Sequence, residues 1–242
     1  MKERRSDFDV TNTVNVIDPQ MVCGEVCRLL QKTYPDINLK AVKQLFVDFE
    51  RLYTGKLDGY RACETPYHDM MHALDVALCT TRLLSGFDLR EDRIGAFEAV
   101  LGVVVALLHD SGYIRKTGQH RYRSGAEMTK IHVTQSGNFL AHYLPTLGLE
   151  HAVEACQQML HFTGYEIPVD KIHLRDTRLY TLGAIIGSAD LLAQMSDRCY
   201  LEKCRDRLYV EFVASGLASK DAPNGGFDSP EDLLRKTPDF YR

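Results

Sequence analysis

Apolar residues recur at three- and four-residue spacing through most of the chain, which is the period of an amphipathic α-helix. Residues 20–53 show this spacing twice, and the polar segment YPDIN at 34–38 separates the two stretches. The same spacing predicts further helices, which lie near residues 66–85, 91–109, 123–145, 150–162, 175–197 and 198–215. No strong strand or hairpin pattern is present. The sequence therefore predicts an all-α fold.

One apolar stretch is compatible with two structures. AVLGVVVALL at 99–108 is rich in valine and contains a glycine, as a buried strand can. Its flanks extend the apolar period into a longer segment, so we predict a fully buried helix. The stretch has about half of the ~20 apolar residues that a bilayer-spanning helix needs.

The two ends of the chain differ from its middle. Residues 1–20 are polar, and we expect a flexible arm there, followed by a single helical domain over 21–218. Residues 219–242 predict a loop and a short helix packed on that domain, because Ser229 can cap a helix whose first residue is Pro230. The N-terminal MKERRSDFDV lacks the apolar core of a signal peptide, so we expect a cytoplasmic protein with no membrane partner.

Composition excludes some classes of function. The 242 residues carry a formal net charge of −4, which argues against nucleic-acid binding as the main function. The seven cysteines form no CxxC pair, so we interpret them as reduced and mostly buried thiols. The length suits one large domain with a sizeable core.

The segment PYHDMMHALDV at 66–76 is the first candidate for chemistry. His68 and His72 are four residues apart, so a helix would place both on one face, with Asp75 one turn further along. That face would offer a metal ligand, an acid or base, and a carboxylate that orients a ring. A surface pair or a satisfied pair of core histidines is the alternative.

Two more polar groups interrupt apolar segments. His109 and Asp110 follow directly on the buried run, and Asp190 lies within LGAIIGSADLLAQMSD. Burying such groups without partners is costly, so metal coordination, an ion pair or a capping hydrogen bond must satisfy them. For Asp190 the alternative is a capping role beside Ser188, and Asp197, seven residues later, competes with it for a place at a site.

A basic loop follows the His-Asp pair. It contains four cationic residues, Arg115, Lys116, Arg121 and Arg123. A cationic loop beside a metal site would bind substrate phosphates. A solvated basic loop is the alternative, and the sequence does not choose between them.

Together, PYHDMMHALDV, ALLHD and SADLL resemble, in this order, the HD superfamily of metal-dependent phosphohydrolases over residues 64–200. The first stretch is especially similar to the first histidine motif of class I cyclic-nucleotide phosphodiesterases, where Tyr-His-Asn precedes His-Ala and Asp-Val at the same spacing. The resemblance implies an HD-domain, phosphodiesterase-like helical bundle. It implies a first metal ion held by His72, His109, Asp110 and Asp190. It also implies that His68 protonates the leaving oxygen and that Asp110 bridges two ions.

Two further histidines lie where two-metal branches of the superfamily, such as the HD-GYP phosphodiesterases, have theirs. The resemblance implies that His132 and His161 hold a second ion, although Phe162 replaces one histidine of the HD-GYP pair. The four remaining histidines are interpreted as surface or packing residues: His120, His142, His151 and His173.

The resemblance implies an enzyme. We expect a metal-dependent phosphohydrolase, a phosphodiesterase in which a metal-bound hydroxide attacks the phosphoester of a nucleotide or cyclic nucleotide. One or two divalent ions are expected, and imidazole and carboxylate ligands suit Fe, Mn, Zn or Mg. Two alternatives stay open: an HD-fold di-iron oxygenase, and a non-catalytic HD module that binds a ligand.

Overall fold

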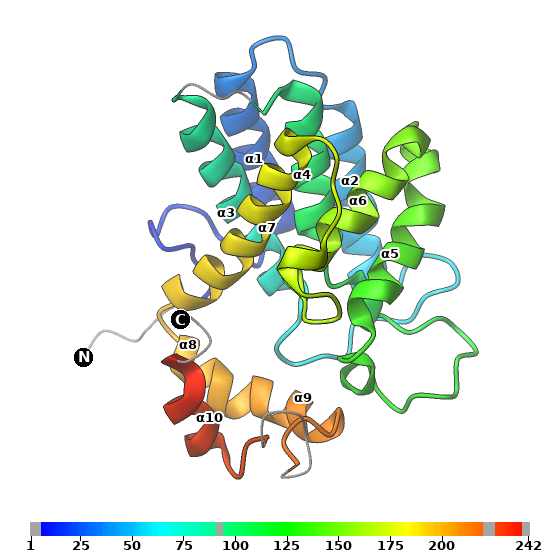
Figure 1. Ribbon diagram of the computed structural model, residues 1–242, viewed down its shortest axis with the longest axis vertical. Coiled ribbons are helices and arrows are strands. Elements are labelled where there is room, and N and C mark those ends of the chain that lie inside the picture. The colour runs from blue at the N-terminus through cyan, green and yellow to red at the C-terminus, as the bar shows by residue number, and fades with distance from the viewer. Residues whose placement is uncertain (1–5, 91–93, 220–225, 239–242) are drawn as a thin grey trace.

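The computed structural model describes residues 6–90, 94–219 and 226–238, and these residues form an all-α fold (Figure 1). The main bundle consists of α1 (Pro19–Thr33), α2 (Lys40–Tyr53), α3 (Met70–Asp88), α4 (Ala96–Leu108), α5 (His132–Tyr143), α6 (Val153–Leu160) and α7 (Thr177–Ser196). In the described ranges, extended backbone pairs only at isolated bridges. The all-α prediction is confirmed.

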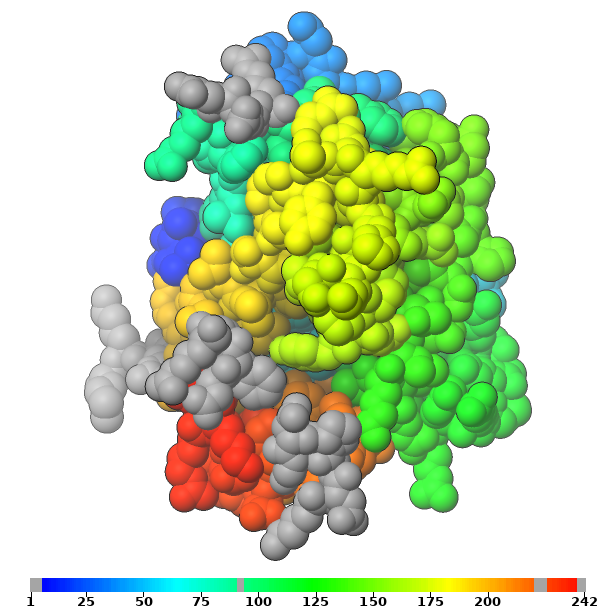
Figure 2. Space-filling view, in the orientation of Figure 1, coloured from blue at the N-terminus to red at the C-terminus, as the bar shows by residue number. Residues whose placement is uncertain are grey.

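Short helical turns connect and extend the bundle. The 3-10 turns are η1 (Ser111–Tyr113), η2 (Gly125–Met128), η3 (Leu144–Leu147), η4 (Glu150–Ala152), η5 (His161–Thr163) and η6 (Val169–Lys171). The C-terminal part consists of α8 (Tyr200–Lys203), the π-helical η7 (Cys204–Leu208), α9 (Tyr209–Ala214) and α10 (Pro230–Lys236). In the space-filling view this part forms the lower end of the molecule, below α7 (Figure 2).

Helix α4 is the centre of the core. It packs against α2, α3, α6 and α7, and every residue from Ala99 to Leu108 is buried. The segment Ala96–Tyr113 is long and apolar enough to cross a bilayer, with a mean hydropathy of 1.3, but 83% of it is buried inside the protein. The predicted buried helix is therefore confirmed, and its apolar character is explained by the core.

The helix α3 begins later than the sequence pattern predicted. Asp69 adopts extended backbone and its side chain accepts a hydrogen bond from the backbone N–H of His72, at 2.9 Å, so it is the N-cap. His68 therefore precedes the helix, and the prediction that His68 and His72 share one helix face is wrong. The Asp69 carboxylate satisfies a backbone N–H that the first turn leaves free, so α3 begins after Asp69, whereas apolar spacing alone predicted an earlier start.

The prediction of a flexible N-terminal arm is wrong for residues 6–18. Asp9 is buried, and its carboxylate accepts hydrogen bonds from the backbone N–H groups of Thr13 and Val14. Arg82 of α3 pairs with the same carboxylate at 2.7 Å. These hydrogen bonds and this ion pair hold the N-terminal segment against α3, although its composition alone predicted a flexible arm. Residues 1–5 lie outside the described part of the chain.

The predicted tail helix is confirmed. Ser229 caps α10 by accepting a hydrogen bond from the Asp232 backbone N–H, and Pro230 is its first residue. A small second core joins this helix to the rest, since Leu233 is buried with Tyr67 and Cys204. The C-terminal part thus packs against the segment that leads into α3.

Gly112 in η1 is where two backbone segments come closest. A Cβ atom at this position would lie 1.9 Å from the carbonyl oxygen of His132 and 2.7 Å from the backbone nitrogen of Ser136. The Gly112 N–H also donates to the Ser136 hydroxyl at 2.8 Å, and that hydroxyl donates to the carbonyl of His109. This contact holds the start of α5 against the end of α4.

We predict that Gly112→Ala lowers the free energy of unfolding by about 3 kcal/mol or more, because backbone atoms cannot move aside as a side chain can. Gly24 is the matched control, since it lies in the exposed face of α1 with no atom within 4 Å of an added Cβ. Gly24→Ala should raise stability by about 0.5–1 kcal/mol. Urea titration followed by circular dichroism measures both, and equal stabilities for the two variants would contradict the close contact.

Candidate metal centre

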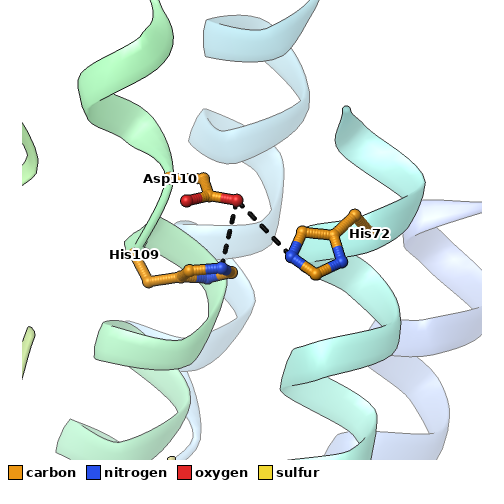
Figure 3. Close-up of side chains that lie close together, drawn as sticks. All are labelled: His72, His109 and Asp110. Carbon is orange, nitrogen blue, oxygen red and sulfur yellow. Dashed lines mark ion pairs between the residues drawn. The ribbon is translucent and has the colours of Figure 1, made fainter. Parts of the chain in front are cut away.

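Four helices, α3, α4, α5 and α7, bring the candidate ligands together, and Figure 3 shows three of these residues: His72, His109 and Asp110. His72 lies in the first turn of α3, and His109 and Asp110 follow the last turn of α4. Asp190 lies in the middle of α7, and His132 is the first residue of α5. Residues that are up to 118 positions apart in the chain thus meet at one point.

His72, His109 and Asp110 form a buried group whose ligand atoms all lie within 4.8 Å of one another. Asp110 Oδ2 is 3.1 Å from His109 Nε2 and 3.5 Å from His72 Nε2 (Figure 3). The carboxylate thus lies between two imidazole nitrogens that point at the same space.

These three atoms are the observation that indicates a metal. His72 Nε2, His109 Nε2 and Asp110 Oδ2 are all buried, and none has a hydrogen-bond partner in the described structure. The His109 Nδ1 lies 2.8 Å from the carbonyl oxygen of Ala106, which fixes the proton on Nδ1 and leaves the Nε2 lone pair free. Leaving three converging polar atoms buried without partners is costly, and a bound cation removes that cost. The group therefore fits a divalent metal ion.

Asp190 borders this group. Its Oδ1 lies 3.2 Å from His72 Nε2 and 3.9 Å from His109 Nε2. Gln194, one turn further along α7, donates to Oδ1 at 3.1 Å, and the Tyr67 hydroxyl donates to Gln194 at 3.0 Å. Asp190 is thus oriented toward the histidines by a chain of hydrogen bonds.

Asp197 does not compete for this place. It ends α7 as the C-cap residue, accepts a hydrogen bond from the Cys199 backbone N–H at 2.7 Å, and pairs with Lys203. Asp75 lies beside His72 in the same part of α3, but no hydrogen bond joins the two within the described residues. The orientation of the His72 ring by Asp75 therefore has no geometric support.

His132 approaches Asp110 from the other side. Its Nε2 is 3.7 Å from Asp110 Oδ1, the oxygen that does not face His72 and His109. Its Nδ1 lies 2.6 Å from the carbonyl of Thr129, so this ring also directs Nε2 at the carboxylate. The two oxygens of Asp110 thus face different imidazoles: Oδ2 faces His72 and His109, and Oδ1 faces His132.

His161 is not brought into this group by any ion pair or ring contact among the described residues. It begins η5, and its Nδ1 is buried without a hydrogen-bond partner. The same turn passes close to His132, since a Cβ at Gly164 would lie 3.9 Å from His132 Cε1. A second-metal role for His161 remains a prediction.

His68 is held beside the metal group by a residue that the sequence reading missed. Glu211 in α9 has a fully buried side chain, and its Oε2 lies 2.5 Å from His68 Nδ1. Its Oε1 accepts the backbone N–H groups of Tyr67 at 2.6 Å and His68 at 3.2 Å. The sequence did offer a hint, because Glu211 interrupts the apolar stretch YVEFV as Asp190 interrupts its own.

Tyr113 contacts both His68 and His132. Its ring stacks on His68 with centroids 4.5 Å apart and on His132 with centroids 4.5 Å apart. Tyr113 is almost fully buried. It thus fixes the positions of both imidazole planes.

Burial and neighbouring charges shift the titration of the site. Burial opposes protonation of His68, but the carboxylates of Glu211 and Asp110 outweigh it and raise the His68 pKa to about 9. Burial likewise opposes protonation of His109, and Asp110 raises its pKa to about 9. Burial would raise the pKa of Asp110, yet the surrounding histidines hold it well below its usual range. Without a bound cation, the charge of the Asp110 carboxylate thus favours protonation of His68 and His109.

The predicted phosphate-binding role of Arg115 is not supported. Its guanidinium is nearly buried, pairs with both carboxylate oxygens of Glu64 and donates to the carbonyl of Tyr122. Lys116, Arg121 and Arg123 are exposed on the loop, and Arg121 lies over the Tyr122 ring at 5.4 Å. Arg115, the arginine nearest in sequence to His109 and Asp110, is thus engaged in an ion pair with Glu64 that forms only in the folded chain.

The other histidines lie at the surface or in packing contacts, as interpreted. His142 Nδ1 lies 2.7 Å from the Asn138 carbonyl, and the His151 ring stacks on Phe97 with centroids 5.4 Å apart. His120 and His173 are exposed.

A family model described as Npun_R2479-like matches residues 117–242, just over half of the chain, and the chain belongs to this family. The matched part contains His132, Asp190 and Glu211, whereas His72, His109 and Asp110 precede it. No curated protein and no solved structure matches the chain.

We predict that purified protein contains a divalent metal and that His109→Ala and Asp110→Ala each reduce its metal content at least tenfold, because each removes one of three converging ligands. His142→Ala is the matched control, since His142 is an exposed histidine on α5. Elemental analysis after dialysis, with circular dichroism to check the fold, measures this. Full metal content in folded Asp110→Ala protein would show that the group does not bind the ion.

Proposed function

We propose that this member of the Npun_R2479-like family is a metal-dependent phosphohydrolase that cleaves a phosphoester of a nucleotide-like substrate. The observation that carries the proposal is a carboxylate-paired histidine beside the candidate metal group: the His68–Glu211 pair adjoins His72, with the His68 and His72 ring centroids 5.8 Å apart. The order and type of these residues also support it, because they resemble the HD superfamily.

A bound divalent ion would supply a water of lowered pKa and would neutralise charge on the phosphoryl oxygens. The ligands His72, His109 and Asp110 fit such an ion, with Asp190 beside them. The Asp110 carboxylate is suited to a second ion as well, because its Oδ1 faces His132 while its Oδ2 faces the other two histidines. Fe, Mn, Zn and Mg all accept this ligand set.

In this proposal, His68 protonates the leaving group. Glu211 holds Nδ1, and no hydrogen bond within the described residues engages Nε2. Its side chain is 15% exposed, whereas those of His109 and Asp110 are 1% and 2% exposed, so solvent reaches His68 more than it reaches either of these two residues. When a water oxygen forms its bond to phosphorus and the bond to the leaving oxygen breaks, the Nε2 proton passes to that oxygen.

Glu211 stabilises the protonated form of His68. The buried carboxylate accepts from the ring and from two backbone N–H groups, so it stays ionised and fixed while the imidazolium forms. Tyr113 stacks on the same ring and prevents it from turning. The pair therefore resembles other acid-base dyads in which a carboxylate orients and charges a histidine.

The first test is hydrolysis. Metal-reconstituted protein should hydrolyse bis-(p-nitrophenyl) phosphate and at least one cyclic nucleotide, and folded Asp110→Ala protein should lose this activity, while His142→Ala should keep it. Release of p-nitrophenolate and chromatography of the nucleotide measure the rates. An iron-loaded protein that consumes O₂ with a substrate and hydrolyses no phosphoester would contradict the proposal and favour the oxygenase alternative.

The second test separates proton donation from metal binding. We predict that His68→Asn lowers kcat by about 10²–10⁴ for an ester with an alkoxide leaving group, the range of general acid catalysis. The loss should be much smaller for a p-nitrophenyl ester, because nitrophenolate leaves without a proton. Metal content should not change. Equal losses on both esters would show that His68 is not the proton donor.

The third test is the pH profile. Glu211 pairs with His68 Nδ1 and raises the pKa of the ring against the effect of burial, so kcat for an alkyl ester should fall as rising pH removes the proton from His68. Glu211→Gln removes this charge, so the fall should move to lower pH. A profile that Glu211→Gln leaves in place would contradict the role of this carboxylate.

A further inference from the structure

The first turn of α5 has no cap of its own. Its N-cap residue is Ile131, whose side chain has no hydrogen-bond acceptor. The backbone N–H groups of a helix's first turn have no partner within the helix, so they need an acceptor from elsewhere. His132, whose Nε2 lies 3.7 Å from Asp110 Oδ1, is the first residue of this turn. The position of a candidate metal ligand therefore depends on a turn that its own N-cap residue does not stabilise.

Glu166 supplies the missing acceptor from 32 residues further along the chain. Its Oε1 accepts the backbone N–H of Thr134 at 3.1 Å, and its Oε2 accepts the Thr134 hydroxyl. Thr134 is the third residue of α5, and the N–H at this position is one that capping side chains bind. A carboxylate at a helix N-terminus is also favoured by the helix dipole. Glu166 thus caps α5 from outside the helix.

The backbone just before Glu166 contacts the same turn. A Cβ atom at Gly164 would lie 2.3 Å from Val133 Cγ2 and 3.9 Å from His132 Cε1. Val133 is buried, so its side chain is held in place by the core. The backbone of Gly164 and the side chain of Glu166 therefore both lie against the first turn of α5.

Two other contacts orient the His132 ring itself. Its Nδ1 lies 2.6 Å from the Thr129 carbonyl, and the Tyr113 ring stacks on it with centroids 4.5 Å apart. These contacts set the plane of the imidazole, whereas Glu166 holds the helix turn from which the side chain extends. Loss of the cap should therefore move the ring relative to both Asp110 and Tyr113.

We propose that Glu166 is a positioning residue for His132, because it caps α5 and so holds the imidazole opposite Asp110 Oδ1. His161 lies five residues before Glu166 in the same segment, so the cap also ties the segment of His161 to that of His132. The consequence for a second metal ion rests on the proposed function, whereas the placement of the ring does not.

The first measurement is the NMR signal of His132 Cε1–H in metal-free, full-length protein, identified by its absence in His132→Asn. Because Tyr113 stacks on the ring, its ring current displaces this signal from that of a free histidine. In Glu166→Ala the signal should move toward the free position, while that of exposed His142, on the same helix, should stay.

Two variants control this measurement. Glu166→Gln should keep the parent signal, because its amide oxygen can accept the Thr134 N–H and its amide NH₂ can donate to the Thr134 hydroxyl. Glu154→Ala should also keep it, since Glu154 is an exposed carboxylate in the first turn of another helix, α6. If Glu166→Ala does not fold, Thr134→Val decides: it removes one of the two hydrogen bonds and should move the signal in the same direction by less.

Isothermal titration with Mn²⁺ relates the placement of His132 to metal binding. The parent protein should take up two ions, and Glu166→Ala should bind the second about 10–100-fold more weakly and the first unchanged. Glu166→Gln should bind both as the parent does. A parent protein that takes up one ion would contradict the second ion of the proposed function, while the NMR signal still decides the role of Glu166.

Two results would overturn the proposal. One is an unchanged His132 signal in folded Glu166→Ala protein, which would show that the ring is held without the cap. The other is an equal displacement in Glu166→Gln and Glu166→Ala, which would assign the effect to the charge of the carboxylate and not to its two hydrogen bonds.

Discussion

The burial of one carboxylate, Asp110, is the constraint on which the rest of the site depends. Its two oxygens lie within 4 Å of three imidazole nitrogens, and its side chain is 2% exposed. An ionised carboxylate in such a place must be surrounded by positive charge or it takes up a proton. The bundle meets this requirement by bringing a histidine from α3, one from the end of α4 and one from α5 to the same point. The apolar helix α4 makes this possible, because its buried residues carry His109 and Asp110 directly into the core.

The parts of the fold that the sequence predicted are those set by local chemistry. The valine-rich run at 99–108 proved to be a buried helix, and Ser229 with Pro230 begins the tail helix as capping rules require. His109, Asp110 and Asp190 could be selected because each interrupts an apolar segment. The parts that could not be predicted depend on tertiary contacts. Because Asp69 caps α3, the helix begins after His68. Because Arg115 pairs with Glu64, its guanidinium is not free to bind a phosphate.

Glu211 shows why a site residue can be missed when only the sequence is considered. It lies 143 residues from His68, and the motif resemblance that identified the histidine ends near residue 200. Only the packing of the C-terminal helices against the segment before α3 brings the carboxylate to the ring. The family match begins at residue 117, so it contains His132, Asp190 and Glu211 but not His72, His109 and Asp110. The candidate site joins the matched part of the chain to the part that precedes it.

The segment Asp110–Ser111–Gly112 connects the candidate metal group to α5. Asp110 faces the histidines, and the backbone of Gly112 lies against His132 and Ser136. His132 is the first residue of α5, so a shift of α5 relative to this segment would move its imidazole. The distance of 3.7 Å between His132 Nε2 and Asp110 Oδ1 is therefore the coordinate that such a shift would change. The Ser136 hydroxyl donates to the carbonyl of His109, so the same contact also ties α5 to the end of α4, where His109 and Asp110 lie.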